Sequence, residues 1–124
     1  MRLELLRERA VAALSDADYQ DVVDLCDELL VVAREHQDSY SEQRAGDLHA
    51  TASCLLNRSV PESIEHLQYS LARAHERKVP KDIYRCHLNL DRALSAAGNA
   101  AEAQTHRAAA DHVAMRMRYH VGGR

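Results

Sequence analysis

One helical pattern of apolar residues recurs three times along the 124 residues of the chain. The second copy follows the first after 42 residues, and the third follows after a further 39. The three sets are Val22, Leu25, Leu29 and Val32; Ile64, Leu67, Leu71 and Ala74; and Ala103, His106, Ala110 and Val113. Each set keeps the spacing of one face of an α-helix. A regular period of this length is typical of repeat proteins, in which each unit buries its apolar face against a neighbour.

Start and stop signals divide the chain into six helices joined by short turns. We expect helices over residues 1–14, 19–36, 42–57, 60–78, 80–97 and 100–119, a turn at 37–40 and a frayed tail at 120–124. Pro61 and Pro80 suit the first turn of a helix, and Gly98 suits the end of one. Neither Trp nor Phe is present, and only four Gly and two Pro occur, which argues against a β-sandwich. The predicted fold class is all-α.

The segment from Asn89 to Ala103 resembles part of a tetratricopeptide repeat, namely its first helix, Gly-containing turn and second-helix start. Asp18 to Val22 resembles the same turn in an earlier repeat. The period near 40 residues is similar to the long-helix variety of this family in bacterial regulators, whereas about 34 is usual. The resemblance covers residues 3–117. It implies one domain of three antiparallel helical hairpins, at about residues 3–37, 42–78 and 81–119, stacked as a right-handed α-solenoid.

The chain departs from the family pattern at three kinds of position. The expected residues are an aromatic early in each first helix, a Gly in the middle of that helix, and an aromatic in the second helix. Their places are taken by Leu6, Leu48 and His87; by Ala10, Ala52 and Asp91; and by Cys26, Gln68 and Arg107. A generic array of helical hairpins therefore stays open as the alternative.

The resemblance implies that the stacked first helices line a groove for an extended peptide or a partner helix. The matched groove residues are His49, Ser53, Leu56, Asn57, Arg85, Leu88, Asn89, Arg92 and Ser95. Guanidinium and amide groups suit carboxylate and backbone acceptors. We therefore expect Arg85 and Arg92 to recognise an acidic segment of a partner. The alternative is that these side chains are ordinary solvated residues.

Charge is unevenly distributed, although the net charge is only -3. Residues 1–62 hold 13 acids and 6 bases, and residues 63–124 hold 6 acids and 10 bases. We interpret the acids between Asp16 and Asp47 as solvated helix faces. Opposite charge at the two ends also fits head-to-tail association. The last helix has no helix after it to cover Val113, Met115 and Met117, so we expect it to pair with a second copy or dock a partner.

The sequence predicts no catalytic, metal or cofactor site. No two of the eight His are three or four residues apart, as ligands on one helix would be, and no Cys-x-x-Cys pair occurs. A nucleophile elbow and a Gly-rich phosphate loop are also missing. Arg107, Arg116, Arg118 and Arg124 could contact phosphate, but basic residues near a helix end also complement its dipole, so nucleic-acid binding is not expected.

No apolar run approaches the roughly 20 residues of a membrane span, and the N-terminus does not resemble a secretory signal. We expect a cytoplasmic protein with three reduced thiols. The predicted function is a non-catalytic protein or peptide interaction module, in the regulatory or sensory part of a bacterial signalling protein. The alternative is a self-assembling oligomerisation domain that uses the last helix and the opposite charges of its ends.

Overall fold

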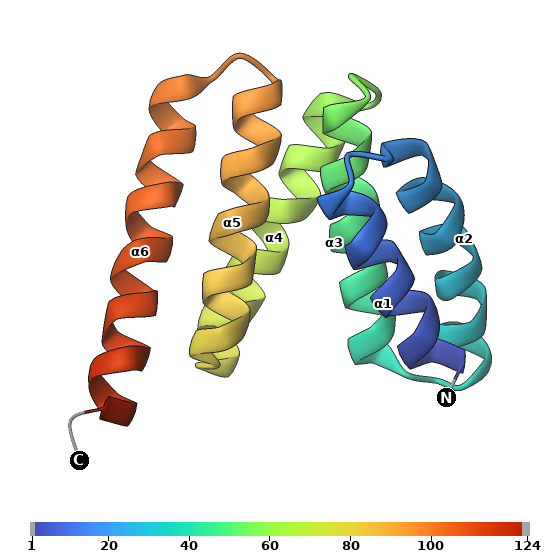
Figure 1. Ribbon diagram of the computed structural model, residues 1–124, viewed down its shortest axis with the longest axis horizontal. Coiled ribbons are helices and arrows are strands. Elements are labelled where there is room, and N and C mark those ends of the chain that lie inside the picture. Colours follow the sequence, from blue (N-terminus) through green and yellow to red (C-terminus); the bar gives the residue numbers. More distant parts are fainter. Residues whose placement is uncertain (1, 123–124) are drawn as a thin grey trace.

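The computed structural model describes residues 2–122, which form six α-helices and no strand (Figure 1). The helices are α1 (Arg2–Ser15), α2 (Tyr19–Glu35), α3 (Ser39–Leu55), α4 (Val60–Arg77), α5 (Pro80–Ala96) and α6 (Ala100–Gly122). The predicted all-α class is confirmed. Within the described part of the chain, no helix combines the length and the apolar character that crossing a membrane requires.

Two predicted boundaries are wrong. Helix α3 begins at Ser39, three residues earlier than expected, because the Asp38 side chain accepts a hydrogen bond from the Ser41 backbone N–H at 3.1 Å and caps the helix. This shortens the expected turn at 37–40. Helix α6 continues to Gly122, so residues 120–122 belong to the helix rather than to a frayed tail. Residues 1, 123 and 124 lie outside the described residues.

Helices α1, α2, α3 and α5 end in the same hydrogen-bonded turn. The second residue after each helix end has a positive φ: Ala17 60°, Gln37 52°, Asn57 57° and Gly98 84°. Its N–H and that of the next residue bond back to carbonyls of the last helical turn. Gly98 adopts this conformation without strain, and the predicted stop there is confirmed. The other three carry a side chain into a left-handed conformation that costs about 1–2 kcal/mol each.

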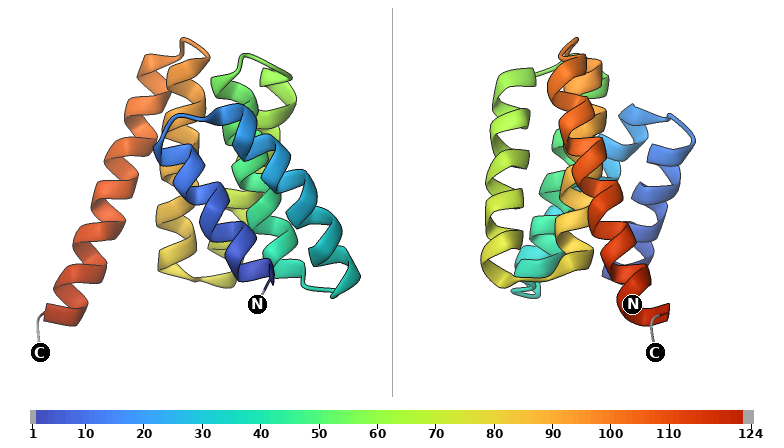
Figure 2. Two further views of the ribbon diagram at one scale, coloured as in Figure 1. Left: turned by 45° about the vertical axis from the view of Figure 1, so that its right-hand side comes forward. Right: turned by 90° about the vertical axis from the view of Figure 1, so that its left-hand side faces the viewer.

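Each helix packs against the next one along the chain, and the first helices of successive hairpins also touch, α1 against α3 and α3 against α5. Among the described residues, α6 contacts α5 alone, and α1 contacts only α2 and α3. The two ends of the stack therefore lie apart, with α6 at one side of the molecule and α1 and α2 at the other (Figures 1 and 2).

The core is divided into separate clusters rather than gathered round one centre. Two clusters join α1, α2 and α3, and a third joins α3 to α6. The repeated apolar pattern faces these clusters, since Val22, Leu29, Leu67, Ala103 and Ala110 are all fully or almost fully buried. Full burial of a large apolar side chain contributes about 1.5–3 kcal/mol. Helix α3 contributes residues to all three clusters, which explains why nine of its residues are buried.

Candidate functional site

Three arginines from the three first helices gather around the side chain of Tyr40. The Tyr40 hydroxyl accepts hydrogen bonds from Nη1 of Arg44 at 3.4 Å and from Nη1 of Arg85 at 3.2 Å. The guanidinium carbon of Arg7 lies 6.0 Å from the centroid of the Tyr40 ring. We call these four residues the Tyr40 arginine cluster. They come from α1, α3 and α5, so the cluster exists only because the hairpins stack.

Local structure positions each member of the cluster. Tyr40 lies in the first turn of α3, next to the Asp38 cap, and Arg44 follows one helical turn later on the same face. Arg85 reaches across from α5, where Asp82 accepts a hydrogen bond from its Nη1 at 3.1 Å. The Tyr40 side chain is 41 % exposed, so the cluster is open to a ligand.

The cluster carries more positive charge than its own acids balance. Among the described residues, no carboxylate lies within 4.0 Å of a nitrogen of Arg7 or Arg44, while Arg85 pairs with Asp82. Burial alone raises the pKa of the Tyr40 hydroxyl, but the hydrogen bonds and charges of Arg44 and Arg85 outweigh it and lower that pKa. The environment therefore favours negative charge at this place.

A buried polar network lies beneath the cluster and was missed by the sequence analysis. Asp47 is 5 % exposed, and its Oδ1 accepts hydrogen bonds from Ser70 Oγ at 2.5 Å, His66 Nε2 at 3.1 Å and Gln43 Nε2 at 3.3 Å. The interpretation of Asp47 as part of a solvated face is therefore wrong. Helix α3 is covered on several sides, so this acid has no outlet to solvent. The sequence signal for the burial of this part of α3 was the run of small residues that follows Asp47, from Ala50 to Cys54.

A cavity of about 20 Å³ separates this network from the Tyr40 arginine cluster. Arg44, Arg77, Arg85, Asp47 and Asp82 are among the residues that line it. Its size suits about one water molecule, and its lining offers both donors and acceptors. The cavity therefore extends the polar surface of the cluster inward without providing room for a substrate.

Of the nine residues matched to the family groove, only Arg85 joins the Tyr40 arginine cluster. Ser53 and Asn89 are 6 % and 5 % exposed and lie beneath the surface. His49 Nε2 lies 3.5 Å from Asp27 Oδ1, on α2. The remaining positions are as follows: Leu56 and Leu88 are half-buried, Asn57 occupies the turn after α3, Arg92 is exposed on α5, and exposed Ser95 donates to Asp91.

The last helix is incompletely covered, as its sequence predicted. Met115 is 66 % exposed, and Val113 and Met117 are half-buried. Arg107 does not contribute to this free surface. Its guanidinium forms a two-pronged ion pair with Asp91 on α5, at 2.9 and 3.0 Å.

Three histidines from three helices meet, although none is close to another in sequence. The Nδ1 atoms of His87 and His106 lie 2.9 Å apart, and the ring of His75 is 6.2 Å from that of His87, edge to face. Burial, and then the neighbouring rings of His106 and His75, lower the pKa of His87 to about 4. The search for pairs along one helix missed this cluster. The signal was that His87 and His106 take repeat positions held by leucines elsewhere.

The chemistry available to these groups is limited. Among the described residues, no set of three or more His, Cys, Asp or Glu side chains is placed to hold a metal ion. All three cysteines are buried and free, as predicted. Burial is the main cause that raises the pKa of Cys26 and of Cys86 to about 12, so neither is an activated thiolate. Comparisons of the chain with protein-family models, with curated proteins and with solved structures find no match.

Proposed function

We propose that this chain is a non-catalytic protein-interaction module that binds an acidic segment of a partner at the Tyr40 arginine cluster. The observation that carries the proposal is the convergence of Arg7, Arg44 and Arg85 on one exposed tyrosine, where only Arg85 forms an ion pair within 4.0 Å among the described residues. An incoming carboxylate accepts from guanidinium groups in a charge-assisted hydrogen bond. The Tyr40 hydroxyl that now accepts from Arg44 and Arg85 is a neutral acceptor, whereas a carboxylate brings a negative charge and can accept two parallel bonds from one guanidinium.

The helix contacts support the architecture that this function needs. Each hairpin packs on the next, and the first helices of successive hairpins contact one another, which supports an α-solenoid. We infer a right-handed solenoid of the tetratricopeptide type. The resemblance in sequence also supports a place in the regulatory or sensory part of a bacterial signalling protein in the cytoplasm. A surface shared by several repeats suits an elongated ligand better than a small one.

The test measures binding of a fluorescein-labelled peptide of twelve residues, alternating Glu and Ser, by fluorescence anisotropy at about 50 mM salt. Arg44→Ala and Arg85→Ala should each weaken binding by at least about tenfold, since a bond to a charged group contributes about 1.5–3 kcal/mol. Arg92→Ala is the matched control, because Arg92 is exposed on the same helix as Arg85 but lies outside the cluster. Equal affinity of the double variant Arg44→Ala/Arg85→Ala and the Arg92→Ala control would contradict the proposal.

Self-assembly is the second candidate, and the exposure of Met115 favours it. An oligomerisation domain that used the free side of α6 would associate without any partner. Static light scattering over a range of concentrations separates the two functions. A monomer at high concentration excludes assembly, and binding of the acidic peptide is unaffected by that result.

A further inference from the structure

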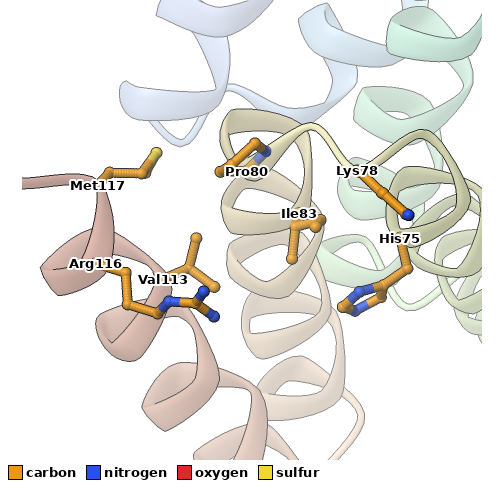
Figure 3. Close-up of a pocket in the computed structure, with 7 residues that line it drawn as sticks. All are labelled: His75, Lys78, Pro80, Ile83, Val113, Arg116 and Met117. Carbon is orange, nitrogen blue, oxygen red and sulfur yellow. The ribbon is translucent and has the colours of Figure 1, made fainter. Parts of the chain in front are cut away.

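A groove of about 690 Å³ lies at the α6 end of the molecule, away from the Tyr40 arginine cluster (Figure 3). The end of α4, the start of α5 and the last part of α6 enclose it. Pro80 and Ile83 of α5 face Val113 and Met117 of α6 across the groove. These four side chains make its lining apolar. We call it the α6 groove.

The polar groups of the α6 groove are basic side chains. Lys78 and His75 come from the α4 end, and Arg116 comes from α6. None of the described residues that line the groove is acidic, and neither Lys78 nor Arg116 has a described carboxylate within 4.0 Å of its charged nitrogens. An occupant therefore gains most if it carries carboxylates beside its apolar side chains.

The lining also decides the backbone conformation of the occupant. An extended peptide would set its N–H and C=O groups against Pro80, Ile83, Val113 and Met117, which offer no side-chain hydrogen bonds. Unpaired backbone groups against an apolar surface cost free energy. A helix satisfies these groups internally and presents apolar residues at intervals of three and four to such a groove.

The corresponding groove one hairpin earlier has a different character. It lies between α2 and α4, has a volume of about 500 Å³, and is lined mainly by polar residues. Two of them, Arg34 and Glu42, form an ion pair at 3.0 Å. The apolar lining is therefore a property of the α6 groove and not of every such space in the stack.

We propose that the α6 groove docks an amphipathic helix of a partner protein, whose apolar stripe is flanked by Asp or Glu. The apolar side chains of that helix lie between Ile83 and the α6 pair Val113 and Met117. Its carboxylates reach Lys78 and Arg116 at the rim. This interaction uses none of the residues of the Tyr40 arginine cluster, so an experiment that contradicts one proposed binding site does not contradict the other.

The probes are three labelled peptides of 18 residues. The first is an amphipathic helix with a Leu stripe flanked by Glu, the second has Lys in place of every Glu, and the third is the first with two central Pro that prevent helix formation. We expect the first peptide to bind, and the second and third to bind at least about tenfold more weakly. Binding of the first should also weaken as salt rises from about 50 to 500 mM.

Two neighbouring pairs on α6 supply matched variants. Met117→Glu should reduce affinity for the first peptide at least tenfold, whereas Met115→Glu should not change it, because Met115 does not line the groove. Arg116→Glu should likewise reduce affinity for the first peptide, whereas Arg118→Glu should not change it, because Arg116 lines the groove and Arg118 does not. Met117→Glu should cause the same loss of affinity in an Arg44→Glu background as in the wild type, which separates this site from the Tyr40 arginine cluster. Circular dichroism melting of each variant shows whether it is folded.

Three results would overturn the proposal. Equal affinity of Met117→Glu and Met115→Glu would show that the groove is not used. Equal binding of the acidic and basic peptides would remove the role of the basic rim. Self-association that Met117→Glu abolishes would make a second copy of the chain the occupant, in place of a partner helix.

Discussion

The Nδ1 atoms of His87 and His106 lie 2.9 Å apart, so one of these rings donates a hydrogen bond and the other accepts it. The rings belong to α5 and α6. At the repeat-equivalent positions of the first hairpin, Leu6 and Leu25 pack in one apolar cluster. A polar pair thus replaces an apolar pair in the last hairpin. Because α6 contacts α5 alone among the described helices, this pair is part of what holds α6 in place.

The free energy of unfolding should fall between about pH 6.5 and pH 4 because of His87. The pKa of this residue is lowered from 6.5 to about 4, first by burial and then by His106 and His75. Between those values the unfolded chain binds more protons than the folded one, so acid favours unfolding. The loss reaches at most about 3 kcal/mol, and no loss from this group occurs above pH 7. Urea unfolding at a series of pH values measures it.

His87→Leu should flatten this pH dependence, because it removes the titrating imidazole. Leucine should fit at this position, since it occupies the equivalent position in both other hairpins. His36→Gln serves as the control, since His36 is exposed at the end of α2. A His87→Leu variant that loses stability in acid as steeply as the wild type and the control would show that His87 is not the titrating group.

The two histidines should be coupled when they are replaced. His106→Leu leaves the imidazole of His87 without its hydrogen-bond partner at a position that is 8 % exposed, which should cost about 1–3 kcal/mol. His87→Leu/His106→Leu removes both polar groups and should recover most of that loss. Thermal unfolding of the two single variants and the double variant at pH 7.5 gives the coupling energy. Additive losses would mean that the observed contact does not stabilise α6.

The sequence predicted the helices and the buried face of each second helix because those depend on local spacing. It could not show which departures from the repeat pattern compensate one another. Asp91 takes a position where the first hairpin has Ala10, and Arg107 takes that of Cys26; Ala10 and Cys26 pack together, whereas Asp91 and Arg107 form an ion pair. Taken singly, each residue weakens the pattern, but together they preserve the contact between the helices.

The candidate site was less predictable than the fold, for a related reason. Arg85 was predicted as a ligand-binding residue, but its neighbours Tyr40, Arg44 and Arg7 come from two other helices and share no repeat position with it. The distance between such side chains depends on how the hairpins stack and on which rotamers they adopt. Neither quantity can be obtained from the spacing of residues along one helix.

Asp47→Ala should destabilise the fold by about 2–4 kcal/mol. The variant removes the acceptor of hydrogen bonds from Ser70, Gln43 and His66, and leaves the hydroxyl of almost fully buried Ser70 without that acceptor. Glu42→Ala is a suitable comparison, because Glu42 forms a partly exposed ion pair with Arg34 that contributes about 0–1 kcal/mol. Urea unfolding measures both losses. Equal losses would show that the network around Asp47 contributes no more than a surface pair.

Gly46→Ala should stabilise the chain less in the wild type than in a His66→Ala background. Replacing Gly by Ala inside a helix contributes about 1 kcal/mol. A Cβ at position 46, however, would lie 3.0 Å from Cε1 and Nε2 of His66, whose Nε2 is 3.1 Å from Asp47. In the wild type the His66 ring must move away, which weakens its hydrogen bond to Asp47. In the His66→Ala background no ring is present, so the new Cβ has room. Urea unfolding of the four proteins should give a coupling of about 0.5–1.5 kcal/mol, and equal effects in both backgrounds would show that Gly46 is not needed for the contact between His66 and Asp47.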